Sequence, residues 1–357
     1  MAYFFLVRRN GLVAAAVEWY KNEKTMDNVV THQAIEQIEQ LAGGSVLPRC
    51  LHAVANIGVA DALDDTPKDV AALAAATGVK ADALSRVLRL LSANGVFTYR
   101  DGLVSHTNAS RLLRADHPQS MRPLVRMLGL TAFWSVIGEM EYSLRTGLAA
   151  DAKVLAGGTW GYLSENAEAS RIFDEAMAAK AYAQVAGVTA AYDFSSFKVV
   201  GDIGGGKGHL LQAVLKSAPD ARGILFDQAH VIHASGASSD RLTLQAGDFF
   251  TDNLPSCDAY LLMDVIHDWD DEHATKILRR VRAAASANAR VLVIEAIVPE
   301  DPHPNWCKTL DIWMLAIGGK QRTLREHATL LGNAGFKFTR EIDTRMGVSI
   351  IEGVRSG

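Results

Sequence analysis

The 357-residue sequence has few cysteines, no long apolar run and no large excess of charge of either sign. Its three cysteines, Cys50, Cys257 and Cys307, are far apart, which excludes a disulfide framework and a zinc knuckle and indicates a reducing cytoplasm. No apolar run approaches the ~18 residues that a membrane-spanning helix requires. The 36 basic and 40 acidic side chains leave a net charge of −4, which argues against a polyanion-binding protein. We therefore expect a cytoplasmic protein without a membrane or nucleic-acid partner.

Apolar residues are plentiful: they make up 49% of the chain, against 21% for charged residues, so a large core can form. At ~150 residues per domain, the length predicts two domains. Residues 1–30 fit neither domain, because the apolar run 3–7 precedes Arg8 and Arg9, the reverse of a secretory signal. We expect a leader of uncertain order there, with a membrane-surface helix as the weaker alternative.

Residues 31–116 alternate short helical patterns with turn residues. Thr66 and Pro67 predict the N-cap and first residue of one helix, and a second helical pattern follows it. Two short strand patterns, 96–99 and 103–105, flank an Asp-Gly turn. Helix, turn, helix and hairpin in this order predict a mainly α winged-helix domain.

A winged helix can bind DNA, so its charge has to be weighed. Residues 61–115 carry seven basic and six acidic side chains, a net charge of +1. This is too small for a phosphate-neutralising face, although Arg86 and Arg89 lie on one side of the second helix. We therefore favour packing against a partner subunit, which predicts a homodimer. A winged-helix regulator that senses a metabolite is the alternative.

Long helical patterns occupy residues 117–194 and carry Trp134, Phe173 and Met177. Aromatic and methionine side chains at helical spacing are usually core. At a domain boundary they can also line a small-molecule pocket. We predict connecting helices that form a substrate wall.

A glycine-rich loop follows the apolar run 198–203 and precedes a helical pattern from His209. A dinucleotide fingerprint would need a small residue where His209 stands, and no run fits a P-loop. The pattern Asp202-x-Gly204-x-Gly206-x-Gly208 instead matches the loop of enzymes that use S-adenosylmethionine (SAM). Backbone N–H groups of such a loop face the cofactor.

Strands and helices alternate after this loop, and the ends of the strands carry polar residues. Asp227 follows the second strand and can accept both ribose hydroxyls. Asp248 and Phe249 follow the third strand and can contact adenine, while His267 follows the fourth. A fifth strand and a C-terminal hairpin complete the pattern. The prediction is an α/β fold with a doubly wound, Rossmann-like sheet.

Six motifs in order, VVGDIGGGKG, FDQ, GDFF, HDWDDE, VLVIEAIVP and GGKQRT, resemble a known family. It is the class I SAM-dependent small-molecule O-methyltransferases, of the plant caffeate type and of bacterial secondary metabolism. The resemblance implies a winged-helix dimerisation domain at 31–116, connecting helices at 117–194 and a SAM-binding catalytic domain at 195–357. It also implies SAM as cofactor and S-adenosylhomocysteine as product.

His267 matches the family's catalytic base. Chemistry supports the assignment, because a phenol has a pKa of ~10 and a histidine of ~6.5, so histidine can take the proton as the methyl group transfers. Glu295 matches the acid that hydrogen-bonds and orients the base, and Asp268 adjoins it. The second supporting acid of the family is Gln321 here, which can accept an imidazole N–H but carries no charge. We therefore expect a weaker base.

The resemblance assigns cofactor and substrate contacts as well. The expected cofactor residues are Asp202, Gly204, Gly206, Asp227, Gln228, Asp248, Phe249, Met263 and Trp269; Met263 replaces a lysine that is frequent in the family. The expected substrate-binding residues are Trp134, Phe173, Met177, Trp313 and Met314. No metal is expected, because the acids at 270–272 stand where a helix begins and the helix dipole favours them there.

The predicted function is SAM-dependent transfer of a methyl group to a hydroxyl of an aromatic small molecule, assisted by a histidine base and no metal. Gln321 leaves a second possibility open: the same fold could methylate carbon or nitrogen, or run a reaction without methyl transfer. The SAM- or metabolite-sensing regulator is a third possibility.

Overall fold

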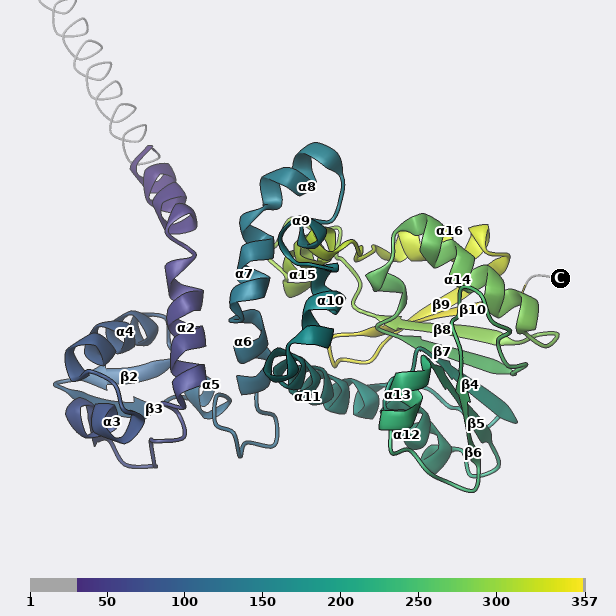
Figure 1. Cartoon of the computed structure of the whole chain (residues 1–357), viewed down its shortest axis with the longest axis horizontal. Helices are drawn as coiled ribbons and strands as arrows, with labels where there is room; N and C mark the ends of the chain where they lie inside the picture. Colours follow the sequence, from purple (N-terminus) through teal and green to yellow (C-terminus); the bar gives the residue numbers. More distant parts are fainter. Residues whose placement is uncertain (1–30, 356–357) are drawn as a thin grey trace, which may run out of the picture. The chain divides into compact units, whose positions relative to one another are not determined.

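The computed structural model describes residues 31–355, so the predicted leader at 1–30 lies outside the described part. The chain divides into two compact units, with the division between Ser110 and Arg111 (Figure 1). The prediction places this boundary at residue 116. None of the helices in the described part is long and apolar enough to cross a membrane.

The N-terminal unit has the predicted helix, helix and hairpin order. Residues 31–42 are helical, and the remaining elements are α2 (Val46–Ile57), β1 (Lys68–Asp69), α3 (Val70–Thr77), α4 (Ala81–Ala93), β2 (Phe97–Arg100), β3 (Leu103–His106) and α5 (Asn108–Arg111). The three strands form a sheet in the order β1-β3-β2. The buried side chains of this unit include Leu73, Leu84, Leu88, Leu91, Phe97 and Val104.

The predicted N-cap of the first of these helices is wrong. Asp69, not Thr66, caps α3, and its side chain accepts the N–H groups of Ala71 and Ala72. Lys68 and Asp69 pair with the hairpin strand β3, which extends the chain beyond the Thr-Pro pair before the helix can begin. This pairing joins segments far apart in the sequence, so local cap chemistry could not predict it.

The second unit contains a seven-stranded sheet in the order β6-β5-β4-β7-β8-β10-β9, which confirms the doubly wound α/β fold. Strands β4 to β8 are parallel, and β9 and β10 form an antiparallel hairpin that pairs with β8. The strands are β4 (Val199–Ile203), β5 (Arg222–Asp227), β6 (Leu242–Ala246), β7 (Ala259–Met263), β8 (Arg290–Glu295), β9 (Phe336–Asp343) and β10 (Ser349–Arg355).

Helices cover both faces of the sheet. The core on one face includes side chains of α12 (His209–Ser217) and α13 (Ala229–Ala234). The core on the other face includes side chains of α14 (Asp271–Ala284) and α16 (Leu324–Asn333). A 3-10 turn, η1 (Ile266–Asp268), lies between β7 and α14.

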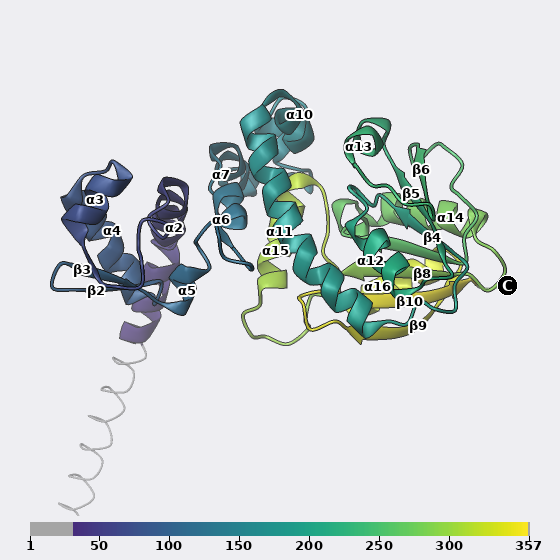
Figure 2. The ribbon, with the colours of Figure 1, turned by 90° about the horizontal axis from the view of Figure 1, so that it is seen from below.

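A layer of helices precedes the sheet in the chain. It consists of α6 (Arg122–Leu128), α7 (Thr131–Gly138), α8 (Met140–Thr146), α9 (Asp151–Val154), α10 (Gly158–Glu165) and α11 (Ala167–Ala191), and α15 (Trp306–Ile317) joins it. Figure 2 shows α11 running from this layer to the sheet, where it lies beside α12. This long helix therefore reaches from the predicted substrate wall to the predicted cofactor domain.

Candidate active site

The glycine loop after β4 has a conformation that only glycine adopts easily. Gly204, Gly206 and Gly208 have φ values of 70°, 58° and 73°. A side chain at Gly205 would lie 2.5 Å from Asp202 Cγ, so this position also requires glycine. The loop opens α12, which begins at His209 as the helical pattern predicts.

Asp227, the last residue of β5, hydrogen-bonds the glycine loop. Its carboxylate accepts the N–H of Gly206 at 2.8 Å and that of Gln228 at 2.7 Å. Each oxygen retains a lone pair that can accept a hydroxyl. The two N–H contacts fix the carboxylate beside the loop, where a ribose would bind.

Asp202 is the most deeply buried acid of the loop. Burial, together with the nearby Asp227 carboxylate, raises its pKa to about 7. Its Oδ2 atom is buried without a hydrogen-bond partner among the described residues. A buried carboxyl oxygen that lacks a donor, next to the glycine loop, fits a ligand that carries an ammonium group, as SAM does.

Aromatic side chains gather where adenine is expected. Phe249 and Phe250 follow β6, and their rings lie edge-on to the Trp269 ring at centroid distances of 6.0 and 4.7 Å. Asp248 lies beside them and accepts the N–H of Phe250 at 2.7 Å. Met263, the last residue of β7, is half-buried. The structure thus brings the predicted cofactor residues to the carboxyl ends of neighbouring parallel strands, where α/β sheets bind ligands.

His267 lies in η1, directly after β7, and its side chain is buried. Burial lowers its pKa to about 4, the nearby Asp264 carboxylate opposes this effect, and the Lys180 ammonium adds to it. Asp268 Oδ1 is 3.5 Å from the ring Nε2, and burial raises the pKa of that carboxyl to about 7. A buried, neutral imidazole is in the protonation state that a base requires.

Glu295 hydrogen-bonds the main chain of His267 and not its imidazole ring. Its Oε1 accepts the backbone N–H of His267 at 2.9 Å, so it holds the main chain of the turn. Its Oε2 has no hydrogen-bond partner among the described residues and lies 3.7 Å from Nε2 of His327. Burial raises the pKa of Glu295 to about 8, with a further contribution from Asp264. A neutral carboxylic acid therefore occupies the place expected for an anion.

Gln321 makes the contact to the ring instead. Its side-chain Nε2 is 2.6 Å from His267 Nδ1, and its Oε1 is buried with no hydrogen-bond partner in the described chain. The prediction placed the amide oxygen, not the nitrogen, against the ring. In the orientation observed, Nδ1 accepts and Nε2 carries the proton. Rotation of the amide by 180° would give Nδ1–H a partner and leave Nε2 free to accept a proton.

Arg322, which is not among the predicted site residues, fixes the turn that carries His267. Its guanidinium is fully buried and donates to the carbonyl oxygens of Ile266 and Trp269 at 3.1 and 2.9 Å. It also contacts Asp271 at 2.9 Å. The position of Arg322, next to Gln321 in the GGKQRT motif, was the available signal.

Two of the acids after His267, Asp270 and Asp271, have partners within the protein. Asp270 caps α14 and accepts the N–H of His273, while Asp271 pairs with Lys320 and Arg322. Within residues 31–355 there is no group of three or more side chains arranged to hold a metal ion.

The predicted wall residues lie on three helices of the same layer. Phe173 and Met177 of α11 and Trp313 of α15 pack against a small core that contains Met127 and Phe133. Phe133 and Trp313 have ring centroids 6.1 Å apart. Trp134 on α7 is half-buried, and Met314 on α15 is buried.

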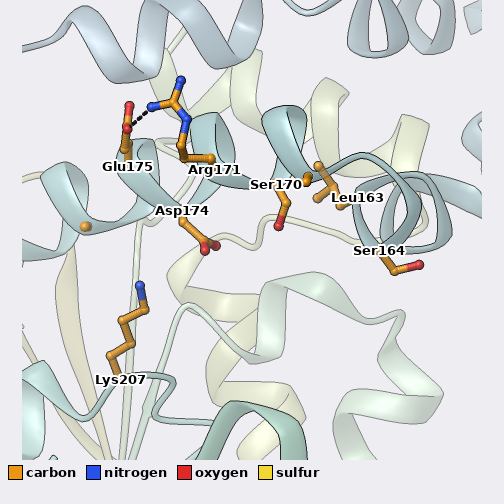
Figure 3. Close-up of a pocket in the computed structure, with 9 residues that line it drawn as sticks. Leu163, Ser164, Ser170, Arg171, Asp174, Glu175 and Lys207 are labelled. Atoms are coloured by element: carbon orange, nitrogen blue, oxygen red, sulfur yellow. Dashed lines mark hydrogen bonds and ion pairs between the residues drawn. The ribbon is translucent and has the colours of Figure 1, made fainter. Parts of the chain in front are cut away.

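A cavity of about 620 Å³ opens on the other face of α11. Figure 3 shows Lys207 of the glycine loop extending toward Asp174 across this cavity, with Arg171 and Glu175 on the same helix face. At about 3.6 residues per turn, Asp174 and Phe173 cannot share a face of the helix. The cavity therefore adjoins the cofactor loop and is separate from the aromatic wall.

Comparison with known proteins decides the family. The family model for the O-methyltransferase domain matches residues 142–337, and that for the O-methyltransferase dimerisation domain matches residues 39–116. The chain belongs to the O-methyltransferase family. It is 40% identical to phenazine O-methyltransferase PhzM of Lysobacter antibioticus over 88% of this chain and 94% of that protein. It is 31% identical to the mitomycin biosynthesis 6-O-methyltransferase of Streptomyces lavendulae over 89% and 94%.

Solved structures agree with this assignment. The S-adenosylhomocysteine-bound CalO1, a methyltransferase of calicheamicin biosynthesis, superimposes with a TM-score of 0.83 at 34% identity, covering 91% of this chain and 98% of that one. Human N-acetylserotonin methyltransferase in complex with SAM gives a TM-score of 0.80 at 26% identity, covering 91% and 98%. This O-methyltransferase is an enzyme that uses SAM as its methyl donor.

Proposed function

We propose that this enzyme methylates a hydroxyl group of an aromatic small molecule, with His267 as the base and without a metal ion. The observation that carries the proposal is the buried, neutral imidazole at the end of β7, held on its main chain by Glu295 and on its ring by Gln321. A hydroxyl is a poor nucleophile until its proton leaves. A histidine beside the acceptor hydroxyl can take this proton as a general base.

The predicted cofactor residues fit SAM. Asp227 would accept the ribose hydroxyls, Asp248 and Trp269 would contact the adenine side, and the glycine loop with Asp202 would meet the amino-acid arm. When bound, SAM supplies an electrophilic methyl group on a sulfonium. Met263 offers no charge to the cofactor carboxylate, so the contact that a lysine makes at this position in the family is missing here.

The proposed step moves one proton and one methyl group. The acceptor O–H proton goes to Nε2 of His267 as the O–CH3 bond forms and the S–CH3 bond breaks. For this step the neutral imidazole must carry its own proton on Nδ1. Once the amide of Gln321 has rotated, this Nδ1–H donates a hydrogen bond to Gln321 Oε1. Asp268, 3.5 Å from Nε2, lies where it can stabilise the imidazolium.

Related proteins support an aromatic acceptor. Their names include a 3-amino-4-hydroxybenzoate 4-O-methyltransferase and a 2,7-dihydroxy-5-methyl-1-naphthoate 7-O-methyltransferase, at 33% and 34% identity. Another relative, at 33% identity, is an 8-amino-8-demethylriboflavin N,N-dimethyltransferase. Nitrogen methylation is therefore the second candidate, and mass spectrometry of the product made with methyl-labelled SAM distinguishes the two.

We also infer a homodimer formed through the N-terminal unit. Ile35, Ile38 and Leu41 recur every three residues along the helix at 31–42, and their side chains are 51%, 65% and 71% exposed. Exposed apolar stripes of this kind mark protein interfaces. We propose a cytoplasmic location as well, supported by the free cysteines Cys50, Cys257 and Cys307, with neither a nucleic acid nor a membrane as partner.

The base assignment predicts the effect of His267→Ala. Loss of a general base lowers the rate of methyl transfer by about 10²- to 10⁴-fold. The affinity for SAM, measured by calorimetry, stays within about twofold because His267 lies outside the glycine loop. Methyl-labelled SAM and a panel of phenols, naphthols and hydroxyindoles provide the assay. Normal turnover of the variant on the best acceptor would contradict the role of His267.

A further inference from the structure

Lys180 and Asp264 form an ion pair that the proposed base and cofactor residues do not explain. Lys180 Nζ lies 2.9 Å from Asp264 Oδ1, and the side chains are 30% and 22% exposed. Lys180 belongs to α11, whereas Asp264 directly follows β7, three residues before His267. Asp264 has a φ of 54°, in the left-handed region that few residues other than glycine adopt. The pair therefore joins the helix of the substrate wall to the segment of the base.

Lys180 continues the apolar face of α11. Phe173, Met177 and Lys180 are separated by four and three residues, so their side chains leave the helix on one face. The first two pack with Trp313 in the core of the helical layer. The wall thus changes from apolar to cationic at Lys180. An acceptor ring lying on Phe173 and Met177 would present its polar substituents at this end.

The charge of Lys180 acts on the proposed catalytic group. It lowers the pKa of His267 and also that of Asp268, although burial has the largest effect on both groups. Asp264 acts in the opposite direction on each of them. A cation beside the base disfavours the imidazolium. It can assist the reaction only by stabilising negative charge on the acceptor.

The ammonium group has hydrogen-bonding capacity left for such a charge. A lysine has three N–H donors, and within residues 31–355 Asp264 is its carboxylate partner. A partly exposed ion pair contributes only ~0–1 kcal/mol to stability, so the fold does not depend on this pair. An anionic oxygen on an aromatic ring would accept hydrogen bonds from the remaining N–H groups of Lys180.

We propose that Lys180, positioned by Asp264, binds an anionic oxygen of the acceptor ring: a ring carboxylate, or the hydroxyl as it loses its proton. The inference rests on the proposed function, because it needs the acceptor at His267. It assigns to α11 two tasks on one face. Phe173 and Met177 contact the ring, and Lys180 selects its charge.

The test compares Lys180→Met with Lys153→Met in the full-length enzyme. Lys153 also pairs with a carboxylate, that of Glu139 at 2.6 Å, and lies on α9, which carries none of the predicted site residues, so it is a matched control. Lys180→Met combined with Asp264→Asn avoids an unpaired Asp264, and Lys180→Arg keeps the charge. Hydroxynaphthoates and the corresponding naphthols serve as acceptors. The readouts are kcat, KM and the Kd for SAM.

A drop in kcat/KM of about tenfold or more for hydroxynaphthoates alone would identify a ring carboxylate as the ligand. A similar drop in kcat for both series, larger for the less acidic hydroxyls, would identify the ionising hydroxyl. Arginine should restore much of either loss. Values equal to those of Lys153→Met would overturn the proposal, and so would weaker SAM binding with unchanged acceptor constants. Absence of methyl transfer by the wild-type enzyme to any hydroxyl would instead refute the proposed function.

Discussion

Replacement of Gln321 by glutamate tests how the charge of this side chain controls the base. Gln321 Nε2 is 2.6 Å from His267 Nδ1, and burial holds the pKa of the imidazole at about 4. Transfer of a proton from a phenol of pKa ~10 to this ring therefore costs ~8 kcal/mol, at about 1.36 kcal/mol per pKa unit. A carboxylate in contact with the ring would raise its pKa by ~1–3 units and lower this cost by ~1.4–4 kcal/mol.

If about half of the proton transfer is complete in the transition state, Gln321→Glu should accelerate the methyl transfer step ~3- to 30-fold at pH 8. The acidic limb of the pH–rate profile should move upward by ~1–3 pH units, because the base is active only above its pKa. Single-turnover transfer from labelled SAM, followed over pH 5 to 9, measures both effects on the chemical step itself.

Gln321→Met is the control, since it removes the contact to Nδ1 without adding charge, and it should slow transfer. The Kd for SAM should be the same for wild type and both variants. A decrease of the rate by about tenfold or more in Gln321→Glu, with SAM binding intact, would refute the reasoning. The amide would then have a role of its own that a carboxylate cannot perform.

Two further predictions concern Glu295 and the N-terminal unit. Burial raises the folded-state pKa of Glu295 to about 8, so the folded enzyme holds a proton that the unfolded chain releases, and stability is lost as the pH rises from ~4.5 through 8. Glu295→Gln should therefore raise the thermal unfolding midpoint at pH 8 but not at pH 4.5; a lower midpoint at pH 8 would mean an ionised Glu295. Ile38→Asp should weaken the dimer about tenfold or more in size-exclusion chromatography with light scattering, whereas Gln37→Asp should not. Equal dimerisation of both variants would exclude the stripe at 31–42 from the interface.

Local patterns predicted most of the sheet and its loop. The helix that the pattern from His209 predicts is α12, and the predicted fourth and fifth strands are β7 and β8. Each depends on nearby residues alone, such as a glycine loop or a run of buried side chains.

The sequence failed where distant segments meet. The helix predicted to start at Thr66 has its N-cap at Asp69 instead, because β1 pairs with β3. Glu295 holds the main chain of His267 rather than its ring, because the turn η1 presents its N–H to β8. In the sequence, Lys180 precedes β4 and Asp264 follows β7, so their ion pair joins segments that are far apart in the chain. No pattern in the sequence predicts this pair. Motif positions identify which residues gather, but not which atoms face each other.

The turn that carries His267 is bound almost entirely through its main chain. Glu295 accepts its N–H, the Lys320 N–H donates to its carbonyl oxygen at 2.8 Å, and Gly319 leaves no room for a side chain beside that oxygen. The helices of the substrate wall take no part in these main-chain contacts, and they reach the segment through two side chains, Lys180 of α11 at Asp264 and Asp311 of α15 at the N–H of Gln321. Substitutions at other positions of α11 and α15 can therefore exchange one acceptor for another without displacing the base. The enzyme is in this sense modular, which suits a family whose named members include a phenazine O-methyltransferase and a mitomycin biosynthesis 6-O-methyltransferase.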